Sequence, residues 1–226
     1  MSPAEQLLRF TATPEEGPVS AILVMPEQPA ALLLLAHGAG TDMKHFFLED
    51  LSQALAATHI ATLRYNFPYA EKGRRGPFNS AVLTATVSSA VGAGAEAAPG
   101  LRIFAGGKSM GGRMTSLAQS KSPLPGVRGL VFFGFPLHPA GKPGIERADH
   151  LEKVNVPTLF IQGPRDKLAL PELLHPLLDR LGARATLHSV DQADHSFKVP
   201  KSSGRSHPDV VNELAEVTSV WTRNQI

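Results

Sequence analysis

Short apolar runs alternate along this chain with longer segments whose apolar residues recur at helical spacing. The run Ala31–Ala36 is apolar at every position, as expected of a strand that is buried on both faces. Five further runs have the length and composition of strands: Ile60–Tyr65, Leu101–Ala105, Val127–Phe133, Pro157–Gln162 and Ala185–Val190. The alternation predicts an α/β fold, in which helices cover both faces of a parallel sheet.

The first part of the chain has a different pattern. Two apolar runs, near Leu7–Ala12 and Val19–Met25, are separated by the turn sequence TPEEG. A short turn with Pro and Gly joins antiparallel strands. We therefore expect a hairpin at the edge of the sheet.

Helical spacing predicts five helices. The first follows Asp42, a candidate N-cap residue. One face of this helix is apolar and carries Phe46, Phe47, Leu51 and Leu55. The other helices are predicted near Asn79–Ala97, Arg113–Gln119, Leu170–Leu181 and Pro208–Arg223. Segment 135–156 is polar and interrupted by Pro and Gly, which predicts a minimal lid, and we expect one domain over residues 1–226.

The most informative segment is Gly106–Gly112 (GGKSMGG), which lies between a predicted strand and a predicted helix. It contains the pattern G-x-S-x-G, in which a serine occupies a tight, strained turn and small neighbours let the backbone fold sharply. Ser109 is therefore the candidate nucleophile. The same residue types also occur where a serine caps a helix or a glycine-rich loop binds phosphate. The spacing G-x-x-x-x-G-K-[ST] of a P-loop is not present.

A nucleophilic serine needs a base to take its proton and an acid to orient that base, in the chain order serine, acid, histidine. Asp166 follows the predicted strand Pro157–Gln162, and His195 follows the last predicted strand. Both then lie at the same edge of the sheet as Ser109. We predict that His195 is the general base and that Asp166 orients it.

Each of these residues has a simpler interpretation. Asp166 could cap the helix near Leu170, and His195 is one of nine histidines. Asp191 and Asp194 compete for the role of the acid. They lie on the loop of His195 itself, where sequence neighbours seldom face each other, so Asp166 is the preferred acid.

An acyl-transfer site also needs hydrogen-bond donors for the oxyanion. In this arrangement they are the backbone N–H after the nucleophile and one from an early glycine-bearing loop. Met110 and Ala39 occupy those positions. We interpret His37, at the start of the same loop, as a structural residue that bonds neighbouring loops.

Composition narrows the class of function. The 22 basic and 20 acidic residues nearly balance, so the chain has no charge surplus typical of nucleic-acid binding. The absence of cysteine excludes a cysteine nucleophile and a thiolate zinc site. The N-terminal sequence has no secretory pattern, and no apolar stretch approaches the roughly 20 residues of a membrane span. We expect a cytoplasmic protein without a nucleic-acid or membrane partner.

Four segments together resemble the α/β-hydrolase superfamily: LLAHGAG, GGKSMGGR, PTLFIQGPRD and DHSF. HGAG, GGKSMGGR and FPLHPAGKP are more similar to a branch of small, lid-poor proteins related to dienelactone hydrolases. That branch includes the hydrolase-like part of the third subunit of the chromatin-associated NSL complex. The resemblance implies an eight-stranded, mostly parallel sheet and a triad of Ser109, Asp166 and His195. Dienelactone hydrolases use a cysteine nucleophile, so their specific activity is not implied.

These features predict a serine hydrolase that resembles carboxylesterases and acts on small esters without a metal or organic cofactor. Phe67, Tyr69, Leu137 and His138 are candidate pocket residues. Lys108, Arg113 and the basic loop Lys72–Arg75 raise the alternative of an anionic substrate, although such charge runs usually form a solvated face. The competing functional class is a binding or scaffold protein that keeps the fold without useful turnover. A peptidase needs a lid or extra domain, for which we find no segment.

Overall fold

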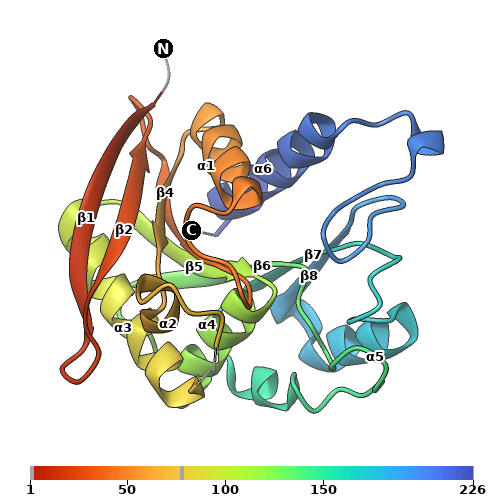
Figure 1. Cartoon of the computed structure of the whole chain (residues 1–226). Coiled ribbons are helices and arrows are strands. Elements are labelled where there is room, and N and C mark those ends of the chain that lie inside the picture. The colour runs from red at the N-terminus through yellow and green to blue at the C-terminus, as the bar shows by residue number, and fades with distance from the viewer. Residues whose placement is uncertain (1–2, 77–78, 226) are drawn as a thin grey trace.

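The computed structural model describes residues 3–76 and 79–225. The strands in these ranges are β1 (Ala4–Thr13), β2 (Gly17–Met25), β3 (Ala31–Ala36), β4 (Ile60–Tyr65), β5 (Arg102–Lys108), β6 (Val127–Phe133), β7 (Thr158–Gln162) and β8 (Ala185–Ser189). They form an eight-stranded sheet in the order β1-β2-β4-β3-β5-β6-β7-β8. Strands β3 to β8 pair in parallel, and β1 and β2 pair antiparallel at one edge (Figure 1). The predicted fold class and the edge hairpin are confirmed.

The helices lie on both faces of this sheet (Figure 1). They are α1 (Phe46–Ala57), α2 (Pro68–Glu71), α3 (Ser80–Ala97), α4 (Met110–Lys121), α5 (Pro171–Leu181) and α6 (His207–Arg223). Three 3₁₀ turns complete the set: η1 (Asp149–Lys153), η2 (Gly182–Arg184) and η3 (Lys201–Ser203). None of the helices in the described ranges combines the length and apolarity that a membrane crossing needs.

The central strand β3 contributes to a core on each side of the sheet because successive side chains of a strand point to opposite faces. Leu32 and Leu34 join the core beneath α3, α4 and α5, whereas Leu33 and Leu35 join the core beneath α1 and α6. All six residues of β3 are buried. The uninterrupted apolar run therefore contributes side chains to two cores, and it keeps β3 in the middle of the sheet.

Two local predictions about the first helix are wrong. Asp42 does not cap it. The Asp42 carboxylate instead accepts the N–H of Lys44 at 2.8 Å, and the Nδ1 of His45 accepts the N–H of Phe47 at the start of α1. A turn precedes the helix, so Asp42 lies too far upstream. Phe46, predicted on the apolar face, is 57% exposed. Neighbouring residues of a helix point in different directions, and Phe47 is the one that faces the core.

Segment 135–156 contains η1 and otherwise no regular secondary structure, so the prediction of a minimal lid agrees with this part of the chain. The segment runs from the C-terminal end of β6 back to the start of β7. The loops after β3, β5, β6, β7 and β8 all leave from the same edge, because the parallel strands share one direction. This edge positions the candidate site.

Candidate active site

Ser109 lies at a sharp turn between β5 and α4. Its φ of 52° is in a region that non-glycine residues seldom adopt, and its ψ is −115°. The N–H of Ser109 donates to the carbonyl of Phe133 on β6 at 3.1 Å, which ties the turn to the sheet. The backbone strain is held by this bond and by helix α4, as expected of a nucleophile elbow.

The two glycines that flank Ser109 are required by close backbone packing. A Cβ atom at Gly107 or at Gly111 would lie 2.3 Å from the carbonyl oxygen of Ala36 at the end of β3. No side chain fits at that distance. The G-x-S-x-G pattern thus lets the elbow pass directly over the neighbouring strand.

The structure brings the three predicted triad residues together. The Nε2 atom of His195 lies 2.9 Å from the Oγ of Ser109, and its Nδ1 atom lies 2.6 Å from Oδ2 of Asp166. Asp166 is 1% exposed, whereas the side chain of His195 is 23% exposed. The serine, histidine and aspartate come from the loops after β5, β8 and β7. The arrangement can move a proton from Ser109 to His195 while a buried carboxylate fixes the imidazole.

Asp166 has no freedom to act as a helix cap, because its oxygens are used within the loop. Oδ2 also accepts from the amide nitrogen of Gln162 at 2.5 Å, and Oδ1 accepts from the backbone N–H of Leu168 at 2.7 Å. Leu170 is the N-cap residue of α5. Gln162 is a further residue of the site that sequence reasoning missed; its place at the end of β7, four residues before Asp166, was the available signal.

The competing acids have other functions. Oδ1 of Asp194 accepts the N–H groups of Ser196 at 2.8 Å and Lys198 at 3.0 Å, so it holds the turn that carries His195. Asp191 is exposed, and its carboxylate contacts Gln192. Neither carboxylate bonds to the imidazole.

Two backbone amides are available for an oxyanion. Ala39 and Met110 both line the cavity that contains Ser109. Among the described residues, neither N–H has a hydrogen-bond acceptor. Met110 is the first residue of α4, where helical N–H groups have no partner within the helix. The structure thus places both predicted donors beside the nucleophile.

His37 joins two loops, as predicted. Its Nε2 atom accepts the backbone N–H of Phe67 at 3.1 Å, and its Nδ1 atom lies 2.9 Å from the carbonyl of Gly38. Burial lowers the pKa of His37 to about 4. A neutral imidazole is the form that can accept the Phe67 N–H, so His37 holds the loop of Ala39 against the loop after β4.

Lys108 supports the histidine loop rather than the pocket. Its Nζ donates to the carbonyl of His195 at 2.7 Å and lies 5.4 Å from the ring centre of Phe197. Burial lowers the pKa of Lys108 to about 8, while the charges of Asp166 and Asp194 oppose that shift. Lys108 is not among the residues that line the cavity beside Ser109, so the structure gives no support to Lys108 as an anion-binding group. The basic loop does not support anion binding either, since Lys72 pairs with Glu16, and Arg74 and Arg75 are exposed.

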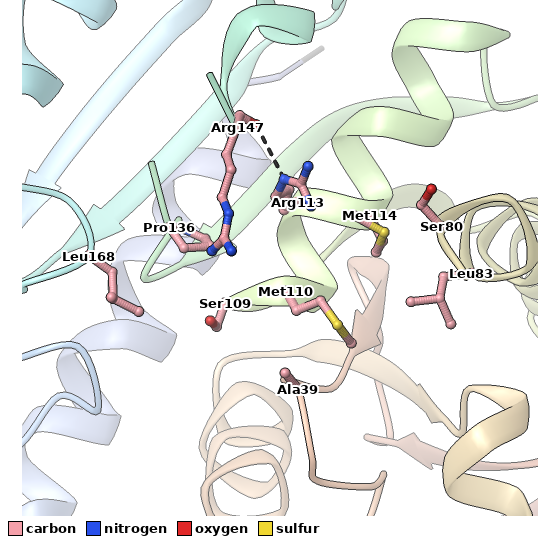
Figure 2. Close-up of a pocket in the computed structure, with 10 residues that line it drawn as sticks. All are labelled: Ala39, Ser80, Leu83, Ser109, Met110, Arg113, Met114, Pro136, Arg147 and Leu168. Atoms are coloured by element: carbon pink, nitrogen blue, oxygen red, sulfur yellow. Dashed lines mark hydrogen bonds between the residues drawn. The ribbon is translucent and has the colours of Figure 1, made fainter. Parts of the chain in front are cut away.

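A cavity of about 280 Å³ opens beside Ser109 (Figure 2). Its wall combines apolar and cationic side chains. The lining residues are Ala39, Ser80, Leu83, Ser109, Met110, Arg113, Met114, Pro136, Arg147 and Leu168. The side chain of Arg147 extends toward Ser109, and Arg113 lies beside Arg147 on α4 (Figure 2).

The four pocket residues predicted from the sequence lie elsewhere. Phe67, Tyr69 and Leu137 are buried in the core beneath α3 to α5, and His138 is 1% exposed. Their predicted place in the wall of the cavity is not the one the structure shows. The large apolar side chains turn inward because burial removes their surface from water. Arg147, Pro136 and Leu168 were missed because they lie on irregular loops without a periodic pattern.

The described residues include no cluster of side chains that could hold a metal ion. Over residues 3–76 and 79–225, no group of three or more His, Asp or Glu side chains has an arrangement suited to a metal ion. The polar groups around Ser109 are instead of the kinds that nucleophilic acyl transfer uses: a serine, a histidine, a buried carboxylate and two free amides.

Residues 29–223 match the family described as an alpha/beta hydrolase domain. This match covers most of the chain, and the protein belongs to that family. The resemblance inferred from the motifs is confirmed at the level of the superfamily.

The curated proteins that match this chain are distant in sequence. Two Mycobacterium tuberculosis proteins, from strains CDC 1551 and H37Rv, are 28% identical to this chain over 208 residues, and each is named a putative phosphoribosyl transferase. The match covers 90% of this chain but 43% of each relative. The chain thus spans less than half of the curated proteins that it matches.

Solved structures share the fold. The dienelactone hydrolase of Anabaena variabilis has a TM-score of 0.79 at 21% identity, over the whole of both chains. A serine hydrolase without a lid from Xanthomonas campestris has a TM-score of 0.74 at 20% identity, covering 96% of this chain and 94% of that one. Est1E of Butyrivibrio proteoclasticus, solved with ferulic acid bound, has a TM-score of 0.71 at 16% identity, covering 92% of this chain and 95% of that one.

Proposed function

We propose that this protein is a serine hydrolase that cleaves small carboxylic esters. The observation that carries the proposal is the continuous hydrogen-bonded chain from Ser109 through His195 to the buried Asp166, at 2.9 and 2.6 Å. This series of hydrogen bonds ends at a serine on a strained elbow, and the serine lies beside a cavity with two unpaired amides. Such a set of groups has a direct chemical use in acyl transfer.

In the first half of the reaction, the Oγ of Ser109 attacks the ester carbonyl while Nε2 of His195 takes its proton. The N–H groups of Ala39 and Met110 bind the oxyanion of the tetrahedral intermediate. His195 then gives the proton to the leaving alcohol, which departs as the acyl-enzyme forms. Asp166 remains ionised and stabilises the imidazolium.

In the second half, water occupies the place of the alcohol. His195 removes a proton from this water, and the resulting hydroxide attacks the acyl group on Ser109. Collapse of the second intermediate returns the proton to Ser109 and releases the carboxylic acid. The two half-reactions need no group beyond those that the site contains.

The size of the cavity supports a small acyl group. A volume of about 280 Å³ lies at the lower end of the range for ligand pockets. Segment 135–156 forms no helical cover over it. Short esters therefore fit the site better than long acyl chains.

The proposal is tested by turnover of p-nitrophenyl esters of increasing chain length. We expect hydrolysis of the acetate and butyrate esters by the native chain, with a decline at longer chains. Ser109→Ala should lower kcat/KM by a factor of about 10⁴ or more. Ser202→Ala is the matched control, because Ser202 is exposed on η3 and should behave as the native chain.

Absence of turnover in the native chain would favour a binding or scaffold protein with this fold. The name of the mycobacterial relatives does not alter the proposal, since the chain matches less than half of those proteins. We further propose that residues 1–226 form a single domain and that the protein acts in the cytoplasm without a nucleic-acid or membrane partner. Cell fractionation with an antibody against the chain tests the location.

A further inference from the structure

Two arginines face the cavity beside the nucleophile, although the proposed ester hydrolysis requires neither of them. Arg113 lies on the first turn of α4, where its backbone N–H donates to the carbonyl of Ser109 at 3.1 Å. Arg147 comes from the loop between β6 and η1. Both side chains are partly buried, and both line the cavity (Figure 2).

Most donor atoms of the two guanidinium groups have no acceptor. Nε of Arg113 donates to the carbonyl of Arg147 at 3.4 Å, and Nη1 of Arg147 donates to the carbonyl of His138 at 3.4 Å. The two side chains form no other hydrogen bond to the described residues. Each guanidinium group has five N–H donors. The remaining donors are available to a ligand.

The positive charges are also uncompensated. Across residues 3–76 and 79–225, no carboxylate forms an ion pair with Arg113 or Arg147. His150 packs nearby, and burial and then the charge of Arg113 lower its pKa to about 4. Burial and then the charge of Arg147 lower the pKa of Arg113. Two like charges held together in a half-buried wall are costly unless an anion joins them.

We infer that Arg113 and Arg147 form a carboxylate-binding subsite, and that the substrate is an ester whose acyl part ends in a carboxylate. This inference rests on the proposed function, because it assigns the substrate class of the same site. A planar guanidinium presents paired donors that match a carboxylate.

The acyl part is the portion that reaches the arginines. The cavity joins them to Ser109 and to both oxyanion amides, which surround the ester carbonyl. The leaving alcohol must instead lie beside His195, which protonates it. A carboxylate at the far end of the acyl chain therefore fills the cationic wall.

The test compares two esters of the same length and shape, monoethyl adipate and its uncharged amide, ethyl 6-amino-6-oxohexanoate. Hydrolysis of each is followed by NMR at low salt. We expect the native chain to prefer the anionic ester by about tenfold or more in kcat/KM, since bonds to charged groups are the stronger ones. Equal rates for the two esters would overturn the subsite while leaving the hydrolase proposal intact.

Variants show whether the arginines cause the preference. Arg147→Gln should lower the ratio of kcat/KM for the anionic ester to kcat/KM for the amide ester by about tenfold, chiefly by raising KM for the anionic ester. Arg113→Gln should act in the same direction. Arg75→Gln is the matched control, because Arg75 is exposed and its removal subtracts the same charge. A preference that survives in both cavity variants would overturn the assignment.

A binding arm separates failure of the subsite from failure of the hydrolase. Ser109→Ala cannot turn over an ester, so binding of monoethyl adipate to it is measured by calorimetry. Binding that is lost in the Ser109→Ala, Arg147→Gln double variant supports the subsite even if the native chain proves inactive. Tighter binding of inorganic phosphate than of the monoester would overturn a carboxylate as the ligand, and so would no binding of either.

Discussion

The two sides of Ser109 differ in how completely their polar groups are paired. On one side, His195, Asp166, Gln162 and Lys108 form a connected set of hydrogen bonds. On the other side, Arg113 and Arg147 each donate to one carbonyl at 3.4 Å, the remaining guanidinium donors have no acceptor among the described residues, and neither forms an ion pair there.

This difference separates the groups that position the proposed chemistry from those that await a ligand. A connected hydrogen-bond network favours one arrangement and holds the imidazole in place. Unpaired donors in a half-buried wall gain most when a ligand supplies the missing acceptors. Substitutions in the paired side should therefore change kcat, whereas substitutions in the unpaired side should change KM for charged substrates.

The largest effect is expected from Asp166→Asn, which keeps the shape of the side chain but favours the wrong tautomer of His195. We expect kcat to fall by a factor of about 10³ to 10⁴. Asp194→Asn is the comparison, since Asp194 holds the loop without touching the imidazole. It should cost less than about tenfold. Equal losses in the two variants, measured with p-nitrophenyl acetate, would mean that Asp166 has no special relation to the base.

A smaller but still severe effect is expected from Gly111→Ala. The added Cβ would lie 2.3 Å from the Ala36 carbonyl, so the elbow must shift and Ser109 must move away from His195. We expect a loss of about 1 to 3 kcal/mol in the free energy of unfolding and at least a hundredfold lower kcat. Gly92→Ala is the matched control. It lies in α3 with no atom within 4 Å of a new Cβ and should stabilise the protein by about 0.5 to 1 kcal/mol. Urea denaturation measures both.

The smallest effect concerns Lys108, whose pKa burial lowers to about 8 from an ordinary value of 10.5. Between these values the unfolded chain binds the proton and the folded chain does not, so this group makes the protein more stable as the pH rises through that interval. Below pH 8 the full cost of burying the ammonium is present. From pH 7.5 to 9.5, the native chain should gain about 2 kcal/mol of unfolding free energy relative to Lys108→Met. Lys121→Met, an exposed control, should follow the native profile.

The paired side of the site was largely predictable from the sequence. Ser109, Asp166 and His195 each follow a strand, and parallel strands end at one edge, so order along the chain places them together. Apolar runs predicted β4 and β6 to the residue, because both strands are almost fully buried. The roles of the three residues remain predictions until activity is measured.

The unpaired side was not predictable in the same way. Arg147 comes from an irregular loop whose path depends on tertiary contacts such as its bond to the His138 carbonyl. Phe67, Tyr69 and Leu137 were expected at the pocket, but their apolar surface is buried in the core. On the paired side, the bond from Lys108 to the His195 carbonyl was not predictable either, because it joins two segments far apart in the sequence. Periodicity reports which residues are buried, not which loops meet.

The most direct measurement is the reaction of the purified native chain with a fluorophosphonate probe, followed by mass spectrometry of the labelled peptide. An activated serine at this elbow should give one adduct, on Ser109, that is lost in Ser109→Ala and much slower to form in Asp166→Asn. No adduct, or an adduct on another serine, would contradict the proposal that Ser109, His195 and Asp166 form a working hydrolase.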